Sequence, residues 1–267
     1  MNIQFVKASP TQNVTILVES EVPREEQPRV ASELLEYDSV GGEQVGFLEK
    51  SQTARIRLQM MGGEFCGNAS MATGAYLAWK DGLQDGQSAK YPLEVSGAKG
   101  IVNVGIVRTG KNYLGRVEIP GAEHIDTVAL ETDRGVISVK MVMLPGITHL
   151  VLPSDLGVTP EEIERRIRTW NESINADALG ALIYDSKDSV ITPIVYVPAS
   201  NTVVRERGCG SGTAAIGCLN AENASEFTGD IRQPGGLIRV TAKHQGNRFT
   251  VQIEGTVKIT AMDTALL

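Results

Sequence analysis

Two cysteines of this chain occupy the same local sequence. Cys66 lies in EFCGNASMATGAYLA and Cys209 in GCGSGTAAIGCLNA, so each precedes a glycine and a run of small, helix-compatible residues. The N–H groups and positive dipole end of a helix start stabilise a thiolate or bind a carboxylate. A lone free cysteine is more often a small buried apolar residue, the role we expect for Cys218 within the second predicted helix. The repetition favours a functional pair in Cys66 and Cys209.

Two thiols in repeated settings suit the racemisation or epimerisation of an amino acid. A thiolate on one face of the α-carbon removes a proton while a thiol on the opposite face delivers one, and the roles exchange for the mirror-image substrate. No pyridoxal cofactor is needed if hydrogen bonds to the substrate carboxylate stabilise the carbanion. The amides at the two predicted helix starts, those of Gly67, Asn68, Gly210 and Ser211, would supply such bonds.

Composition and charge exclude several other classes of protein. The chain of 267 residues has a net charge of −7 and no cluster of Lys and Arg, so it lacks the basic surface that nucleic acid or anionic lipid requires. Its three histidines and three cysteines show no metal-ligand spacing, and GCGSGT lacks the lysine of a phosphate-binding loop. No signal peptide and no stretch of about 18 apolar residues is visible. We expect a cytoplasmic protein with reduced thiols, no metal and a small-molecule partner.

The thiol motif belongs to a longer internal duplication. The segment NVTILVES at 13–20 corresponds to THLVLPSD at 148–155, and EQVGFLE at 43–49 corresponds to DALGALIYD at 177–185. Alternation of apolar and polar residues predicts strands in these segments. Beyond the two thiol helices, the matching strands are PLEVSG with LIRVTA and GRVEIPGA with FTVQIEGT.

A helix is predicted between the first two strands of each half. In the second half, TPEEIERRIRTWNESI has Thr159 as N-cap, Pro160 in the first turn and Glu162 in the capping-box position. The first half has VPREEQPRVASELLEY at this place. One apolar stripe of the second-half helix is predicted to face the core: Ile163, Ile167, Trp170 and Ile174.

These elements predict an α+β protein of two pseudo-symmetric lobes, each a mostly antiparallel sheet around a helix that begins at a thiol. We assign 1–122 to the N-terminal lobe and 123–267 to the C-terminal lobe. Aligning the two thiol helices matches Gly74 with Gly217. Because glycine costs about 1 kcal/mol in a helix interior relative to alanine, we predict that both helices are slim and pack closely inside the sheets.

The motifs CGN before a small-residue helix and ERG ahead of CGSGT, together with the duplication, resemble the diaminopimelate epimerase superfamily of cofactor-independent racemases. The resemblance spans nearly the whole chain. It implies lobes in the form of barrel-like sheets around central helices, with the active site in the cleft between them, and acid/base roles for Cys66 and Cys209. It further implies assisting groups at His149 and Glu206, with Arg207 following the glutamate as in the epimerases, and contacts to the substrate or its catalytic network at Asn13 and Gln44.

The departures from the epimerases concern the substrate. The epimerases hold the distal end of their substrate with asparagines in N-x-D-G and G-N-P-H segments, but this chain has Met60, Met61, Gly62 and Gly63 near the first and GITH, with Ile147, at the second. The spacing from Glu206 to Cys209 is also shorter than in the epimerases. With EQVGFLE, EFCGNASM and CGSGTAAIG, the chain is most similar to the histidine racemases of the superfamily, which in some bacteria feed D-histidine into opine-type metallophore synthesis.

Other interpretations stay open on the residues alone. The protein could be a diaminopimelate epimerase, a broad-specificity racemase, a thiol-free isomerase of the superfamily or a non-catalytic ligand-binding module, and the paired cysteines argue against the last two. His149 could be a buried histidine bonded to a carbonyl, and Glu206 with Arg207 a surface ion pair worth little. Lone amides such as Asn13 and Gln44 are common in turns. The sequence is compatible with a homodimer.

Overall fold

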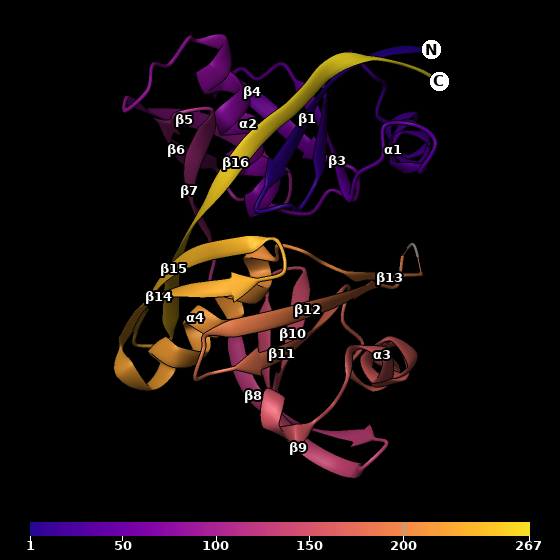
Figure 1. The fold of residues 1–267 in the computed structure, drawn as a ribbon, viewed down its shortest axis with the longest axis vertical. Helices are drawn as coiled ribbons and strands as arrows, with labels where there is room; N and C mark the ends of the chain where they lie inside the picture. The colour runs from indigo at the N-terminus through magenta and orange to yellow at the C-terminus, as the bar shows by residue number, and fades with distance from the viewer. Residues whose placement is uncertain (200) are drawn as a thin grey trace. The chain divides into compact units, whose positions relative to one another are not determined.

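The computed structural model describes residues 1–199 and 201–267 and divides into two compact units (Figure 1). Unit 1 comprises Met1–Glu118 and Glu254–Leu267, and unit 2 comprises Ile119–Ile253. Across the described residues the chain forms sixteen strands, four α-helices and one short 3-10 helix. The protein is therefore of the mixed α+β class and consists mostly of sheet.

Unit 1 is built on strands β1 to β7 and the last part of β16. Its strand order is β1-β2-β3-β4-β5-β6-β7-β16, and β16 also pairs antiparallel with β1, so the order returns to its first strand. Figure 1 shows this end of β16, in yellow, beside β1, in indigo. The pairs β2–β3 and β4–β5 are parallel. The bounds are β1 (Asn2–Pro10), β2 (Thr15–Val18), β3 (Gln44–Glu49), β4 (Ile56–Met60), β5 (Ser88–Val95), β6 (Ile101–Thr109), β7 (Asn112–Pro120) and β16 (Arg248–Leu266).

Unit 2 has the strand order β8-β9-β10-β11-β12-β14-β15-β16, with β13 beside β12. Here β10 and β11 are parallel, as β2 and β3 are in unit 1. The bounds are β8 (His124–Thr132), β9 (Gly135–Leu144), β10 (Ile147–Pro153), β11 (Leu179–Asp185), β12 (Val190–Val197), β13 (Thr202–Arg205), β14 (Glu226–Gln233) and β15 (Gly236–Gln245). A 3-10 turn at Ser154–Leu156 follows β10.

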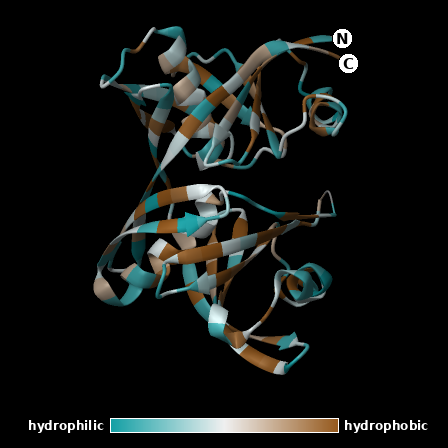
Figure 2. Cartoon of the chain, viewed as in Figure 1, coloured by the Kyte–Doolittle hydropathy of each residue, from teal (hydrophilic) through white to brown (hydrophobic). Residues whose placement is uncertain are grey.

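Each unit has one amphipathic helix on its sheet. Helix α1 (Gln27–Leu35) packs on β3, and α3 (Pro160–Ile174) packs on β8, β11 and β12. The predicted start of α3 is confirmed, because the Thr159 side chain accepts a hydrogen bond from the Glu162 amide at 3.2 Å. In Figure 2 the visible side of α3 is mostly teal and the neighbouring strands are largely brown. The predicted stripe faces the core: Ile163, Ile167 and Trp170 are buried, and Ile174 packs against them partly buried.

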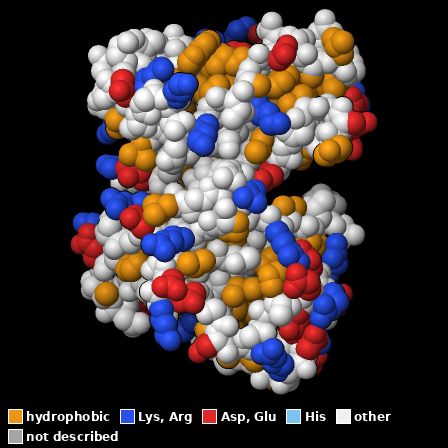
Figure 3. Space-filling model, viewed as in Figure 1, with side chains coloured by type: hydrophobic (Ala, Val, Ile, Leu, Met, Phe, Trp, Pro, Cys, Tyr) orange, Lys and Arg blue, Asp and Glu red, His pale blue; other side chains and the backbone are white. Residues whose placement is uncertain are grey.

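The outer face of α3 carries ion pairs. The Arg205 guanidinium contacts Glu161 and Glu164, and Arg166 contacts Asp133. Figure 3 shows basic and acidic side chains interspersed over the visible face of the molecule. Such exposed pairs contribute about 0–1 kcal/mol each, so the apolar stripe accounts for most of the attachment of α3.

The other two helices begin at the thiols. Helix α2 (Gly67–Lys80) packs against β1, β2, β5 and β6, and α4 (Gly210–Ala224) packs against β9, β10, β14 and β15. The predicted close packing is confirmed at both matched glycines. A Cβ on Gly74 would lie 2.8 Å from Val104 Cγ1, and a Cβ on Gly217 would lie 2.6 Å from Val240 Cγ2. Within the described residues, no helix is long and apolar enough to cross a membrane.

Close packing at Gly217 predicts that alanine at this position destabilises the protein, although alanine usually stabilises a helix relative to glycine. Gly217→Ala would gain about 1 kcal/mol in an ordinary helix interior, but here the added methyl group overlaps Val240. We expect the substitution to lower the free energy of unfolding by about 1–3 kcal/mol, a typical cost of overpacking. Denaturant unfolding measures this difference.

Asn223→Ala is the matched control, because Asn223 is an exposed residue near the end of the same helix. We expect it to leave the stability unchanged or to raise it by a few tenths of a kcal/mol. A Gly217→Ala protein more stable than the parent would show that α4 is not tightly packed.

Candidate active site

Cys66 is the N-cap residue of α2. Its backbone is extended, with φ −131° and ψ 112°, and its sulfur accepts a hydrogen bond from the Ala69 amide at 3.4 Å. Its carbonyl accepts bonds from the Ser70 amide and hydroxyl, at 3.0 and 2.7 Å. The predicted helix start is therefore confirmed, with the half-buried sulfur in the place of the usual capping oxygen.

A chain of side-chain amides leads away from the Cys66 sulfur. The thiol donates to Gln44 Oε1 at 3.1 Å, and Gln44 Nε2 donates to Asn13 Oδ1 and Thr15 Oγ1, each at 2.7 Å. Asn13 Nδ2 in turn donates to Glu43 Oε2 at 2.8 Å. Parallel pairing of β2 with β3 places Thr15 opposite Gln44 and so brings these groups together. The structure thus joins three of the predicted site residues, Asn13, Gln44 and Cys66, in one contiguous set.

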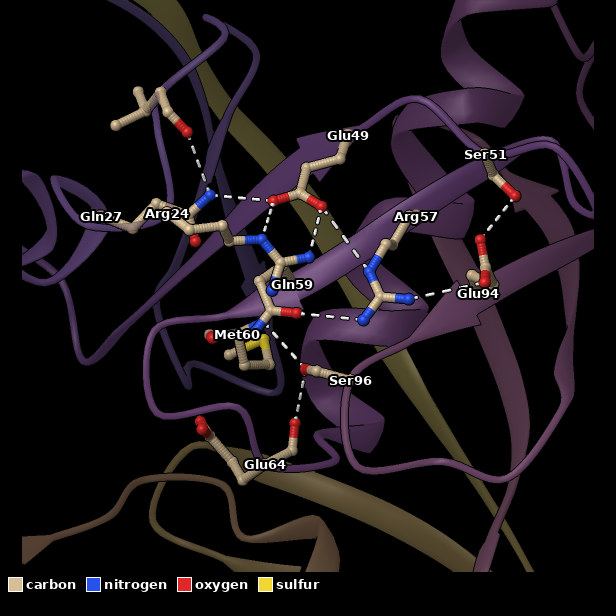
Figure 4. A network of polar contacts seen from close by, with 11 residues as sticks. Arg24, Gln27, Glu49, Ser51, Arg57, Gln59, Met60, Glu64, Glu94 and Ser96 are labelled. Carbon is tan, nitrogen blue, oxygen red and sulfur yellow. Dashed lines mark hydrogen bonds and ion pairs between the residues drawn. The ribbon is translucent and has the colours of Figure 1, made fainter.

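Ser96 fixes the loop that leads from β4 into Cys66. Its hydroxyl accepts from the Met60 amide at 2.9 Å and donates to the Glu64 carbonyl at 2.8 Å. Figure 4 shows that Ser96 lies between the two ends of this loop. The network continues from Met60 to buried Gln59, whose Oε1 accepts from Arg57. These bonds anchor both ends of the loop before Cys66.

Cys209 is the N-cap residue of α4 and is buried. Its sulfur accepts from the Gly212 amide at 3.2 Å, and its carbonyl accepts from the Thr213 hydroxyl at 2.8 Å. Its own amide donates to Gln233 Oε1 at 2.6 Å, while Gln233 Nε2 donates to Thr213 Oγ1 at 2.7 Å. Gln233, itself buried at the end of β14, thus holds the first turn of α4 through both ends of its amide.

Ser211 connects Cys209 to His149. Its hydroxyl lies 3.5 Å from the Cys209 sulfur and 3.0 Å from His149 Nε2. Burial lowers the pKa of His149 to about 3, so the imidazole is neutral at physiological pH. Nδ1 is buried without a hydrogen-bond partner among the described residues, and an unpaired acceptor there costs less than an unpaired N–H. The proton therefore belongs on Nε2, which donates to Ser211 and leaves the serine hydroxyl free to donate to the sulfur.

Gly180 makes room for this imidazole. It lies opposite His149 in the parallel β10–β11 pair, and a Cβ at this position would overlap His149 Nδ1. The partner of His149 Nε2 is the Ser211 hydroxyl, and not a backbone carbonyl as the alternative interpretation supposed.

Glu206 and Arg207 lie on the segment that leads into Cys209. Burial raises the pKa of the Cys209 thiol well above its ordinary value, and the charge of Glu206 and its hydrogen bond with the thiol raise it further. Glu206 thus lies beside the sulfur. The exposed Arg207 guanidinium donates to the Pro234 carbonyl at 3.3 Å.

The predicted site residues form one set in each unit. Unit 1 contains Asn13, Gln44 and Cys66, with Gly67 and Asn68 in the first turn of α2. Unit 2 contains His149, Glu206, Cys209 and Ser211, with Gly210 in the first turn of α4 and Arg207 beside them. Their catalytic and binding roles stay predictions. Cys218 is buried, as predicted, and burial raises its pKa to about 11.

Four residues of these networks were not singled out from the sequence: Thr15, Glu43, Ser96 and Gln233. Glu43 directly precedes Gln44, so the chain position itself was a signal. Ser96 and Gln233 lie in ordinary turn sequences far from either thiol. Among the described residues, no group of three or more His, Cys, Asp and Glu side chains could hold a metal ion.

Sequence comparison links the chain to known proteins over nearly its full length. The family model described as the histidine racemase CntK N-terminal domain matches residues 2–266. A histidine racemase of Staphylococcus aureus is 30% identical over 274 residues, covering 99% of this chain and 98% of that protein. A histidine racemase of Fusobacterium nucleatum subsp. nucleatum is 28% identical over 269 residues, covering 97% and 94%.

Solved structures show the same fold at low sequence identity. A probable proline racemase from Agrobacterium radiobacter K84 has a TM-score of 0.71 at 14% identity, covering 99% of this chain and 93% of that one. A PhzF-family phenazine biosynthesis protein of Bacillus anthracis has a TM-score of 0.62 at 16% identity, covering 100% and 99%. The chain thus has the fold of the proline racemase and PhzF proteins.

The buried neutral state of His149 predicts a loss of stability in mild acid. An unfolded histidine binds a proton near pH 6.5, whereas His149 in the folded protein resists it down to about pH 3. Between these values the unfolded state binds the extra proton, so the free energy of unfolding falls by about 1.4 kcal/mol per pH unit. Denaturant unfolding at pH 7.5 and pH 5.0 should show a loss of about 2 kcal/mol from this residue.

His149→Gln removes the titrating group, so its pH-dependent loss should be smaller than that of the parent by this amount. Exposed His124→Gln, the control, should keep the full loss. Equal losses in the parent and in His149→Gln would contradict a buried neutral imidazole.

Proposed function

The chain belongs to the histidine racemase family, and from this we propose that it interconverts L- and D-histidine without a cofactor. Family membership makes it an isomerase. The observation that carries the proposal is the pair of N-cap cysteines, each with its sulfur at a helix start and within a polar network. Cys218, by contrast, lies in the interior of α4, where its sulfur accepts a bond from the Ala122 amide at 3.4 Å.

The proposed reaction uses one thiol on each face of the substrate α-carbon. For one enantiomer a Cys209 thiolate takes the α-proton, the Cα–H electron pair stays on the substrate as a carbanion, and the Cys66 thiol gives its proton to the opposite face. For the other enantiomer the roles exchange. Before the first step, Glu206 accepts the Cys209 proton, and Ser211 and the Gly212 amide donate to the resulting thiolate.

Amides at the two helix starts would stabilise the carbanion. Gly67 and Asn68 in α2, and Gly210 and Ser211 in α4, lie in the first turn of each helix, at the positive end of the helix dipole. Directed at the substrate carboxylate, they would oppose the charge that develops when the proton leaves. The proposal therefore requires that both thiols reach one substrate, as in the predicted lobes 1–122 and 123–267 of an epimerase-like enzyme.

Two positions favour histidine over diaminopimelate. Ile147, half-buried at the start of β10, and Met60, buried at the end of β4, cannot pair with the distal ammonium and carboxylate of diaminopimelate. An imidazole needs only one or two hydrogen-bond partners. We further propose, because Cys66, Cys209 and Cys218 are in the thiol form, that the enzyme works in a reducing compartment, the cytoplasm. Use of its D-histidine in metallophore synthesis, and a homodimer, stay predictions.

Replacing either thiol tests the two-base mechanism. Cys66→Ser and Cys209→Ser should each lower the rate of racemisation by at least about 100-fold, because a serine hydroxyl is a poor acid and base at neutral pH. Circular dichroism of L-histidine measures racemisation, and NMR in heavy water measures deuterium exchange at Cα. Each variant keeps the base on one face and should therefore retain slow exchange of one enantiomer only.

Cys218→Ala is the control and should racemise histidine like the parent, because Cys218 belongs to the core. Full activity in a protein with both Cys66 and Cys209 replaced by serine would rule out the mechanism.

Substrate preference is tested by comparing specificity constants. Each unpaired polar group of diaminopimelate in an apolar subsite costs about 1–3 kcal/mol. We therefore expect kcat/KM for histidine to exceed that for diaminopimelate by at least about tenfold. A ratio in favour of diaminopimelate would restore the epimerase alternative, and similar values for many amino acids would indicate a broad-specificity racemase.

A further inference from the structure

We propose that Glu43 is a positioning residue that, through Asn13 and Gln44, holds Cys66 as a hydrogen-bond donor. The proposal deepens the racemase function above, since a thiol held as a donor is ready to deliver a proton. The observation that points to it is the unbroken run of hydrogen bonds from the Glu43 carboxylate to the Cys66 sulfur.

The Glu43 carboxylate, at the start of this run, determines which group donates and which accepts in each hydrogen bond. An ionised carboxylate can only accept, so Asn13 must turn Nδ2 toward Glu43 Oε2, at 2.8 Å. Asn13 Oδ1 then faces Gln44 and must accept from Nε2, at 2.7 Å. This leaves Gln44 Oε1 directed at Cys66, 3.1 Å from the sulfur, where it can only accept. A neutral amide in the place of Glu43 would leave both orientations of Asn13 open.

Thr15 supports this orientation but does not impose it. Its hydroxyl accepts from Gln44 Nε2 at 2.7 Å, yet its own bond to the Asn13 carbonyl is long, at 3.3 Å. A hydroxyl can donate as well as accept, so Thr15 could also serve a reversed Gln44. Within the described part of the chain, Glu43 is the group in this run that can only accept.

The backbone holds Glu43 at the start of the run. Its amide donates to the Val14 carbonyl at 2.8 Å, and the next residue, Gln44, begins the parallel pairing of β3 with β2. Asn13 is buried and Glu43 is half-buried, so water competes little for these bonds. Charged side chains on neighbouring segments include Lys7 of β1, which donates to the Val40 carbonyl, and Glu64 in the loop before α2. The run itself consists of Glu43, Asn13, Gln44 and Cys66.

Glu43→Gln tests the proposal because it keeps the shape of the side chain and removes the obligate acceptor. Gln44 can then turn its NH2 group toward the sulfur and favour the thiolate of Cys66. We expect the midpoint of the pH profile for iodoacetamide alkylation of Cys66, followed by peptide mass spectrometry, to move down by about one pH unit. The Cys209 profile, measured in the same samples, should stay in place. We expect kcat for histidine to fall about tenfold with KM changed less than about twofold.

Three further variants complete the test. Glu43→Asp keeps an obligate acceptor and should restore the alkylation profile. Glu36→Gln removes an exposed carboxylate upstream and should change neither profile nor activity. Asn13→Ala breaks the run one step nearer the thiol and should move the Cys66 profile in the same direction, which keeps the proposal testable if Glu43→Gln does not fold.

An unchanged Cys66 profile in Glu43→Gln would overturn the proposal, as would an equal shift at both thiols, which would indicate general loosening of the fold. The alkylation measurement contains no substrate. A parent protein that does not racemise histidine, but in which Glu43→Gln still moves the Cys66 profile, would refute the proposed function and leave the role of Glu43 intact.

Discussion

A sulfur at the N-cap of a helix is the contact on which both sites depend. An N-cap side chain must turn back to meet the amide three residues later, and this fixes the direction of Cys66 toward Ala69 and of Cys209 toward Gly212. The sulfur then lies at the positive end of the helix dipole, where charge on sulfur or on a bound carboxylate is stabilised. The helix itself must lie close to the sheet, which explains glycine at Gly74 and Gly217 despite its low helix propensity.

The two thiols share this backbone but differ in their neighbours. In unit 1 the parallel strand pair places Thr15 opposite Gln44, so a long amide fills the space and reaches Cys66. In unit 2 the corresponding pair places His149 opposite Gly180, so the large ring comes from the other strand and reaches Ser211. The two sulfurs thus have the same place at a helix start but different partners, the Gln44 amide in unit 1 and the Ser211 hydroxyl in unit 2.

Local signals in the sequence predicted the helix starts. Contacts between residues far apart in the sequence could not be predicted in this way. Cys66 and Cys209 before glycine, and Thr159 with Glu162, act within one helical turn, so their geometry follows from sequence spacing. The role of Gln233 depends on the end of β14 meeting α4, and the pairing of β1 with β16 joins the two ends of the chain. The parallel pairing of β2 with β3 and of β10 with β11 could not be predicted either. Alternation of apolar and polar residues indicates which face of a strand is buried, but not whether the neighbouring strand is parallel or antiparallel.

In the proposed reaction Cys209 acts as a base, and burial, which raises the pKa of its thiol, at first opposes that role. The α-proton of an amino acid is a very weak acid, however, and a base with a raised pKa takes such a proton more readily. The cost is a smaller population of thiolate, and two hydrogen-bond donors beside the sulfur reduce this cost. The Gly212 amide and the Ser211 hydroxyl, which is oriented by neutral His149, donate to the thiolate. The charge of Glu206 adds to the cost until Glu206 takes up the proton, as the proposed reaction requires. In the proposed reaction, a buried sulfur with fixed donors would therefore be a stronger base than a sulfur solvated by bulk water.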